Sequence, residues 1–176
     1  MITTNRLIIR PFVMSDSKRL YECCNDFELV KTTLGIPWPY TEKMAESWIP
    51  QKEEDAKNGV SYKYAICMKD TPNNIIGCIS LMGTNSLAKK AELGYWVERK
   101  LWGKGIATEA ANAMIDFGFN TLKLNSIYAR FFDINPASGR VMEKCGMTYC
   151  EMLRQHEFRF DQYYNIKYFE ILNKKN

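Results

Sequence analysis

The stretch Trp96-Val-Glu-Arg-Lys-Leu-Trp-Gly-Lys-Gly-Ile-Ala-Thr-Glu-Ala110 carries the strongest structural signal in the chain. It contains the end of a predicted strand, a short loop with Gly103 and Gly105, and the start of a predicted helix. A helix start presents unpaired backbone N–H groups and the positive end of the helix dipole, and glycines let a ligand approach the backbone closely. The stretch therefore predicts a site for a phosphate or pyrophosphate group.

Two common phosphate-binding motifs do not fit this stretch. The P-loop pattern GxxxxGK followed by Ser or Thr is absent. The dinucleotide pattern GxGxxG fails because Thr108 stands where the third glycine belongs. Two glycines alone are also compatible with an ordinary loop before a helix, so the rest of the chain must identify the ligand.

Apolar periodicity around this stretch predicts a strand, a helix and a second strand. Residues alternate between apolar and polar from Ala91 to Val97 and again from Ile127 to Phe131, which is typical of strands. Between them, apolar residues recur at helical spacing and predict a helix from about Gly103 to Asn120. A strand-helix-strand unit over residues 91–132 should form a right-handed crossover between parallel strands.

The remaining elements are predicted from caps, turns and alternation. They are a strand at 5–13, a helix at 16–24 capped by Asp16, a short helix at 26–34, a helix capped by Thr41 and ending at Lys57, strands at 62–68 and 75–82 joined by a turn-rich connector at 70–74, a helix from Asn135-Pro136 to Gly146, and two final strands joined near 159–162. This order predicts an α/β fold with a mixed, strongly twisted β-sheet flanked by helices on both faces.

Composition narrows the class of protein. The chain has 176 residues, which fits a single domain spanning residues 1–176. Its net charge of +4 is spread along the chain, which argues against nucleic-acid binding. No apolar run is long enough for a membrane span, and the first six residues lack the apolar core of a signal peptide. We therefore expect a cytoplasmic protein, with monomer and homodimer both open.

The histidine and cysteine residues do not indicate a metal site or a covalent catalytic mechanism. A single histidine, His156, excludes a zinc site built on several histidines and lacks the context of a hydrolase triad, so we expect a partly exposed strand residue. The six cysteines include no CxxC pair and are expected to be reduced thiols in the core. We predict no metal site.

Four segments resemble the GCN5-related N-acetyltransferase (GNAT) superfamily. The acetyl-CoA motif of that family, Gln/Arg-x-x-Gly-x-Gly/Ala, is similar to Trp102, Gly105 and Ala107 here, with Trp in place of Gln or Arg as in the RimJ/RimL-type branch. The other three segments lie in matching order and spacing over nearly the whole chain. They are Asn5-Arg-Leu-Ile-Ile-Arg-Pro11, Ala91-Glu-Leu-Gly-Tyr-Trp-Val97 and Asn135-Pro-Ala-Ser-Gly-Arg-Val-Met-Glu-Lys-Cys-Gly146.

The resemblance implies an acetyl-CoA-dependent N-acetyltransferase. The pyrophosphate would lie on the loop amides, and the pantetheine arm along the strand before the loop, as an added strand would. For Trp102 we favour the alternative of a packing residue that anchors the loop. Asn135 fits a helix N-cap as well as it fits a cofactor contact. The implied cofactor-binding residues are Trp96, Val97, Trp102, Gly103, Lys104, Gly105, Ile106, Ala107, Thr108 and Asn135.

The implied chemistry is direct attack of an amine on a thioester, without a covalent enzyme intermediate. Glu92 is the candidate base that takes the amine proton, a backbone N–H near Val97 would stabilise the oxyanion, and Ser138 would protonate the departing thiolate. Glu92 also fits an exposed strand residue paired with a lysine, and Ser138 also fits a helix-end residue.

The acceptor is the least defined partner. It is a primary amine, either a protein N-terminus or a small molecule. The resemblance places its cleft between the loop Gly35-Ile-Pro-Trp-Pro-Tyr40 and the hairpin from Gln155 to Tyr164. A non-catalytic acyl-CoA-binding sensor or scaffold is the alternative function. A nucleotide-binding protein is a third alternative, which would show competition by ATP or NAD.

Overall fold

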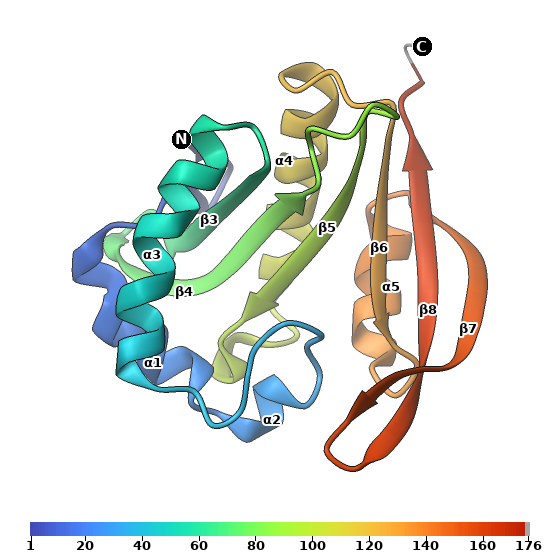
Figure 1. Ribbon diagram of the computed structural model, residues 1–176. Coiled ribbons are helices and arrows are strands. Elements are labelled where there is room, and N and C mark those ends of the chain that lie inside the picture. The colour runs from blue at the N-terminus through green and yellow to red at the C-terminus, as the bar shows by residue number, and fades with distance from the viewer. Residues whose placement is uncertain (175–176) are drawn as a thin grey trace.

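One eight-stranded mixed sheet organises the chain in a computed structural model that describes residues 1–174. The strands lie in the order β1-β2-β3-β4-β5-β6-β8-β7, and the sheet is strongly twisted (Figure 1). Their bounds are β1 Ile2–Thr3, β2 Leu7–Pro11, β3 Ser61–Met68, β4 Thr71–Met82, β5 Lys90–Val97, β6 Ser126–Phe132, β7 Thr148–Arg159 and β8 Gln162–Leu172.

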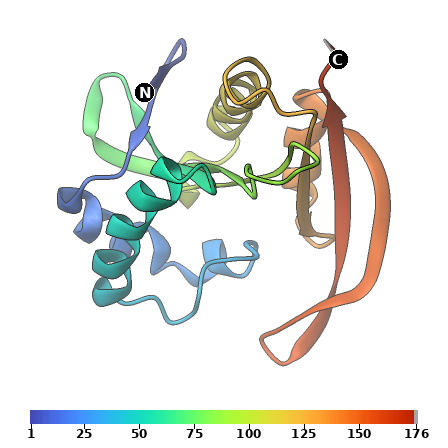
Figure 2. The ribbon, with the colours of Figure 1, turned by 45° about the horizontal axis from the view of Figure 1, so that its top comes forward.

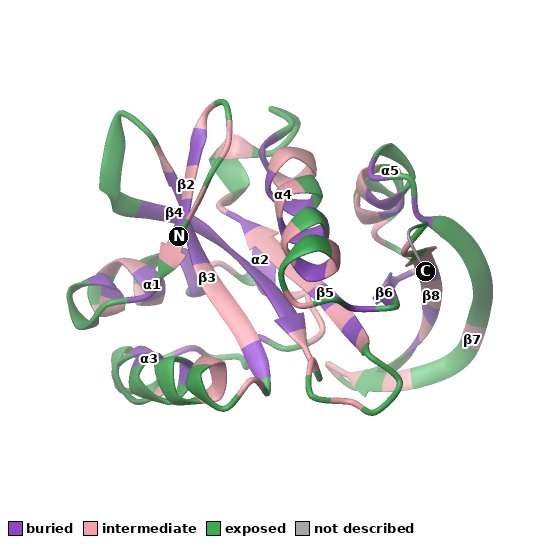
Figure 3. Cartoon of the chain, turned by 90° about the horizontal axis from the view of Figure 1, so that it is seen from above, coloured by how far each residue is buried: buried purple, intermediate pink, exposed green. Residues whose placement is uncertain are grey.

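Helices cover both faces of the sheet, as predicted (Figures 2 and 3). The helices α1, α2 and α3 lie on one face, and α4 and α5 lie on the other. Each group packs on its own cluster of buried apolar side chains. The bounds are α1 Ser17–Cys24, α2 Phe27–Val30, α3 Glu42–Lys57, α4 Ile106–Asn120 and α5 Pro136–Lys144, with short 3₁₀ turns at η1 Met14–Asp16 and η2 Arg99–Leu101.

The two central strands β5 and β6 separate along their length. They pair in parallel only from Lys90 to Glu92 on β5 and from Ser126 to Tyr128 on β6. Figure 1 shows them side by side at their N-terminal ends and far apart at their C-terminal ends. Beyond Glu92, β5 keeps its antiparallel pairing with β4 but has an open edge toward β6. This edge adjoins the predicted binding loop.

Several local predictions need correction. The helix starts at Ile106 and not at Gly103, because Gly103 and Gly105 adopt left-handed conformations outside the helix. The expected connector at 70–74 is largely strand, since β4 already begins at Thr71. Asp16 does not cap α1 with its side chain; its carboxylate instead accepts hydrogen bonds from Arg10 and from the backbone N–H of Val13.

The caps of the longer helices are confirmed. Thr41 accepts a hydrogen bond from the Met44 backbone at the start of α3, and the Asn135 side chain accepts one from the Ser138 backbone at the start of α5. His156 lies on a strand, β7, as expected, and is exposed. All six cysteines are free thiols. Five are buried, but Cys150 is exposed because β7 lies at the edge of the sheet with most of its residues in solvent (Figure 3).

Candidate active site

The loop before α4 presents a run of unpaired backbone N–H groups. Gly103 and Gly105 have φ angles of 75° and 74°, a conformation that glycine adopts without steric cost. Within residues 1–174, no backbone N–H from Gly103 to Thr108 donates to a protein acceptor; the first that does is Glu109, to the Gly105 carbonyl at 3.0 Å. Together with the helix dipole, this row of donors forms an anion-binding cradle.

The cradle is held by the N-terminal segment. Arg6 donates one hydrogen bond to the Lys104 carbonyl at 2.9 Å and another to the Glu109 carboxylate at 2.7 Å. Burial favours the neutral form of Glu109, but hydrogen bonds from Thr4 and Arg6 outweigh it and lower the pKa of this carboxyl. The Lys104 side chain itself is exposed and does not line the pocket described below, so only its backbone belongs to the cradle.

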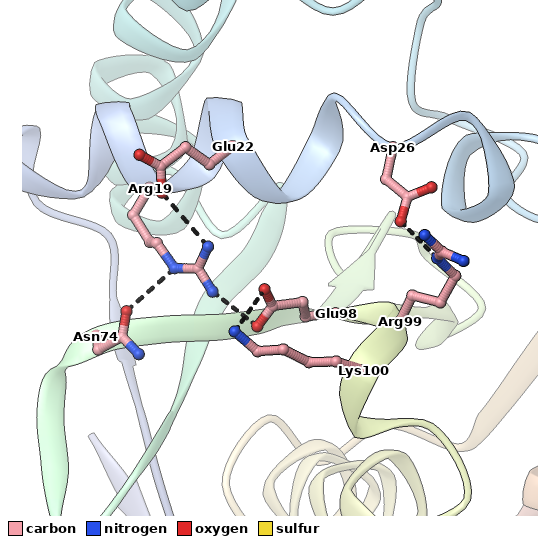
Figure 4. Close-up of polar contacts among 7 residues, drawn as sticks. All are labelled: Arg19, Glu22, Asp26, Asn74, Glu98, Arg99 and Lys100. Atoms are coloured by element: carbon pink, nitrogen blue, oxygen red, sulfur yellow. Dashed lines mark hydrogen bonds and ion pairs between the residues drawn. The ribbon is translucent and has the colours of Figure 1, made fainter.

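A second set of contacts attaches the start of the loop to α1 and α2 (Figure 4). Arg19 donates to Glu98 at 2.7 Å, and Arg99 pairs with Asp26 at 2.8 Å. Burial raises the pKa of Glu98, but hydrogen bonds from Arg19 and Lys100 reverse the effect and lower it. The loop that carries the cradle is therefore fixed to helices on the opposite face of the sheet.

The open edge of β5 offers backbone groups to a ligand. The Glu98 N–H donates to the Ile76 carbonyl on β4. In antiparallel pairing, the backbone N–H and C=O groups of successive residues point alternately toward the paired strand and away from it. The N–H and C=O groups of Tyr95 and Val97 therefore point toward β6 in the region where β5 has separated from it. Trp102 closes the end of this edge, since its indole N–H donates to the Val97 carbonyl at 2.7 Å. Trp102 is 46% exposed, so it anchors the loop through this bond more than through packing.

A pocket of about 890 Å³ passes between β5 and β6 and connects the two faces of the sheet. All the predicted site residues except Lys104 line it. They are Glu92, Trp96, Val97, Trp102, Gly103, Gly105, Ile106, Ala107, Thr108, Asn135 and Ser138. Trp96 packs with the core on the α1–α3 face, whereas Leu93 and Val97 pack with the core on the α4–α5 face. Because side chains alternate between the faces of a strand, Glu92 lies on the α1–α3 side of the pocket and Tyr95 on the α4–α5 side.

Ser138 is held by two donors on the α5 side. Its hydroxyl oxygen accepts hydrogen bonds from the Tyr95 hydroxyl at 3.2 Å and from the Asn135 amide at 3.1 Å. Burial raises the pKa of Tyr95 to about 12, although the bond to Ser138 opposes the shift, so the phenol stays protonated at neutral pH. With both lone pairs occupied, the Ser138 hydroxyl can direct its own hydrogen elsewhere in the pocket. Sequence reasoning missed Tyr95.

Glu92 lies on the other side of the pocket and is paired with an arginine. Its two carboxylate oxygens accept hydrogen bonds from Arg130 on β6, both at 3.0 Å. The predicted alternative, an exposed residue paired with a lysine, is therefore wrong, because Glu92 is mostly buried and its partner is Arg130. Each oxygen keeps a second lone pair that can accept a proton or a water molecule.

The acceptor side differs from the expected one. Gly35, Ile36, Pro37 and Tyr40 line the pocket, but no described residue of the final hairpin does. The hairpin instead contacts the loop that lines the pocket, since Arg159 donates to the carbonyls of Thr33 and Ile36. The wall that the sequence reasoning missed comes from α3, β3 and β4. Its residues are Met44, Ser47, Trp48, Gln51, Lys63, Ser80 and Met82. They belong to a helix and strands whose sequence pattern signals only packing.

Comparison with known proteins assigns the family. The Acetyltransferase (GNAT) domain model matches residues 6–148, which include β5, the cradle and α5. This chain belongs to the GNAT acetyltransferases. It is an acetyl-CoA-dependent N-acetyltransferase, and acetyl-CoA is its co-substrate. The predicted membership of the GNAT superfamily is confirmed, and solved RimL and RimJ structures share the fold of this chain.

Individual relatives agree with this assignment. An uncharacterised N-acetyltransferase of Bacillus licheniformis, p20, is 28% identical over 173 residues, covering 98% of this chain and 96% of its own. The spermidine N(1)-acetyltransferase of Vibrio cholerae is 22% identical, covering 97% and 95%. The ribosomal L7/L12 acetyltransferase RimL in complex with coenzyme A shares the fold of this GNAT protein, with a TM-score of 0.87 at 17% identity and coverage of 98% and 97%.

Within residues 1–174, no group of three or more His, Cys, Asp or Glu side chains is arranged to hold a metal ion. Among the same residues, no helix combines the length and apolar composition needed to cross a membrane.

Proposed function

We propose that this GNAT enzyme transfers the acetyl group to a primary amine, on a small molecule or a protein N-terminus, by direct attack and without a covalent enzyme intermediate. The observation that carries the proposal is the pocket itself, which joins a row of unpaired amides on one face of the sheet to a carboxylate on the other. A non-catalytic acyl-CoA-binding module would need the cradle but not a passage to a second, acceptor-sized space.

The residues present fit acetyl-CoA. The unpaired amides from Gly103 to Thr108 suit a diphosphate, and a Cβ at Gly103 would meet no atom within 4 Å, so the space beside the loop is open. The outward N–H and C=O groups of Tyr95 can pair with a pantetheine amide as an added strand would. When bound, acetyl-CoA supplies the activated acetyl group next to the β5–β6 opening.

Glu92 and Ser138 divide the proton transfers between them. We assign Glu92 to receiving the proton of the attacking amine, directly or through a water molecule, because it approaches the opening from the α3 side. The outward N–H of Val97 is placed to stabilise negative charge on the acetyl oxygen. We assign Ser138 to protonating the thiolate, and Tyr95 and Asn135 to positioning its hydroxyl.

Replacing Glu92 by glutamine tests the base. We expect kcat to fall by about tenfold, less than the roughly 100-fold typical of a direct general base, because bulk water can take the proton instead. Steady-state rates with a reactive amine measure the change in kcat.

The matched control addresses the partner of Glu92. Glu92→Gln leaves Arg130 without its charged partner, so the double variant Glu92→Gln with Arg130→Gln should recover thermal stability without recovering kcat. If the double variant regains the wild-type rate, Glu92 serves only to neutralise Arg130 and the base is another group.

An acceptor screen tests the proposed function as a whole. The purified enzyme, acetyl-CoA and a panel of primary amines are incubated, and free thiol is measured. We expect thiol release that depends on the amine and no acetylated enzyme by mass spectrometry. Tight acetyl-CoA binding without thiol release for any amine would favour the sensor or scaffold.

We also propose that residues 1–176 act as a single N-acetyltransferase domain. The support is the continuous sheet, which includes strands from both ends of the chain, and the contact of Arg6 with the binding loop.

A further inference from the structure

The α3 side of the pocket has a distinctive charge arrangement. Lys63 on β3 pairs in register with Ser80 on β4, and Ser80 pairs with Gly94 on β5, so all three lie on the same face of the sheet. Ser80 and Gly94 are small and form a low floor between Lys63 at one end and Glu92 with Arg130 at the other. A Cβ at Gly94 would approach the Ser80 hydroxyl to 3.0 Å and narrow this floor.

Lys63 is the cation in this region without an ionic partner. Within residues 1–174 its ammonium group forms no hydrogen bond or ion pair; it lies only over the Trp48 ring, 5.8 Å from the ring centre. The neighbouring charges are already paired, Lys52 with Asp55 at 2.6 Å and Glu92 with Arg130 at 3.0 Å. The α3 side of the pocket therefore carries one uncompensated positive charge.

This charge is costly to keep without a partner. Burial lowers the pKa of Lys63, and the nearby Lys52 lowers it further, whereas Cys78, Asp55 and Glu92 oppose the shift. A partly desolvated ammonium that lacks a counter-ion is destabilising. Among the described residues that line the pocket, Glu92 is the only acidic one, and it is paired with Arg130, so no lining carboxylate is left to pair with Lys63.

We infer that the acceptor supplies it: the substrate is a small primary amine that also carries an anionic group, a carboxylate or a phosphate, which Lys63 binds while the amine lies toward Glu92. This inference rests on the proposed function and names its substrate class. A polyamine fits poorly, because a second ammonium would face Lys63 across a pocket with no free carboxylate. The acceptor would thus differ from that of the spermidine acetyltransferase to which the chain is similar.

Matched acceptors test the inference by thiol release. The panel contains ω-amino acids with their carboxamides, phosphoethanolamine with ethanolamine, and spermidine. We expect the anionic member of a pair to have a kcat/KM about 10- to 100-fold higher, as for a hydrogen bond to a charged group. The two anionic series separate a carboxylate from a phosphate. Lys63→Met should remove the preference, so that the ratio of kcat/KM between the anionic and the neutral member of each pair falls to about one.

Two variants control for charge and folding. Lys63→Arg keeps the charge and should keep the preference. Lys69→Met changes an exposed lysine at the β3–β4 turn, outside the pocket, and should behave as wild type. Equal kcat/KM for carboxylate and carboxamide, a preference for spermidine, or an unchanged preference in Lys63→Met would each overturn the inference.

Calorimetry separates this inference from the proposed function. The complex with coenzyme A is titrated with the anionic and neutral member of each pair, for wild type and Lys63→Met. If no amine releases thiol, the catalytic function fails, yet anion-selective binding that Lys63→Met loses still supports the anionic ligand. Equal binding of anionic and neutral amines overturns the inference even where turnover is seen.

Discussion

Gly105→Glu is expected to raise the dissociation constant for acetyl-CoA at least about 100-fold, because like charges brought together at an interface cost several kcal/mol. The carboxylate would enter the amide cradle where the diphosphate is expected to bind. A second cost arises from the backbone, since Gly105 has a φ of 74° and a non-glycine residue in this region costs roughly 1–2 kcal/mol. Isothermal titration calorimetry with acetyl-CoA measures the change.

Two variants separate charge from strain. Gly105→Ala adds strain but no charge, and its Cβ would meet only the Arg6 guanidinium at 3.5 Å, so it should lose much less affinity. Gly83→Glu places the same side chain on a glycine with a φ of 71°, exposed and outside the pocket, and should bind as wild type. Wild-type affinity in a folded Gly105→Glu variant would place the diphosphate elsewhere.

Ser138→Ala is expected to lower kcat by about 100-fold, the lower end of typical general-acid contributions. The thiolate would leave without a donor, while the amides of the cradle remain. Acetyl-CoA affinity should therefore change little, and the helix should persist because Asn135 caps the backbone N–H of residue 138, not its side chain. Single-turnover rates and a separate acetyl-CoA titration measure the two quantities.

Two further variants test whether the hydroxyl at position 138 is the group that matters. Ser138→Thr retains a hydroxyl and should recover part of the lost rate, whereas alanine should not. Tyr95→Phe removes one of the two donors to Ser138 and should give a smaller loss of kcat with acetyl-CoA affinity unchanged. A Ser138→Ala variant that turns over like wild type would exclude Ser138 as the proton donor.

Local sequence determined the elements and the cofactor half of the site. The two glycines, the capping residues and the change from strand to helix period are short-range signals, and they are enough to predict the β5–loop–α4 unit. The predicted fold class is confirmed for this reason, whereas the family, which is also confirmed, was predicted from the resemblance of four segments to the GNAT superfamily. The errors at Gly103 and Thr71 are at element ends, where the backbone conformation depends on neighbouring strands.

Tertiary structure decided the acceptor half. Arg130, Trp48 and Lys63 come from elements far apart in the chain, and their spacing in the sequence carries no period or motif that relates them to Glu92. The same holds for Tyr95, which reads as an ordinary strand residue until α5 places Ser138 beside it. The opening between β5 and β6 arises from sheet twist and long-range pairing, so the meeting of these side chains follows from the assembled fold and not from local propensity.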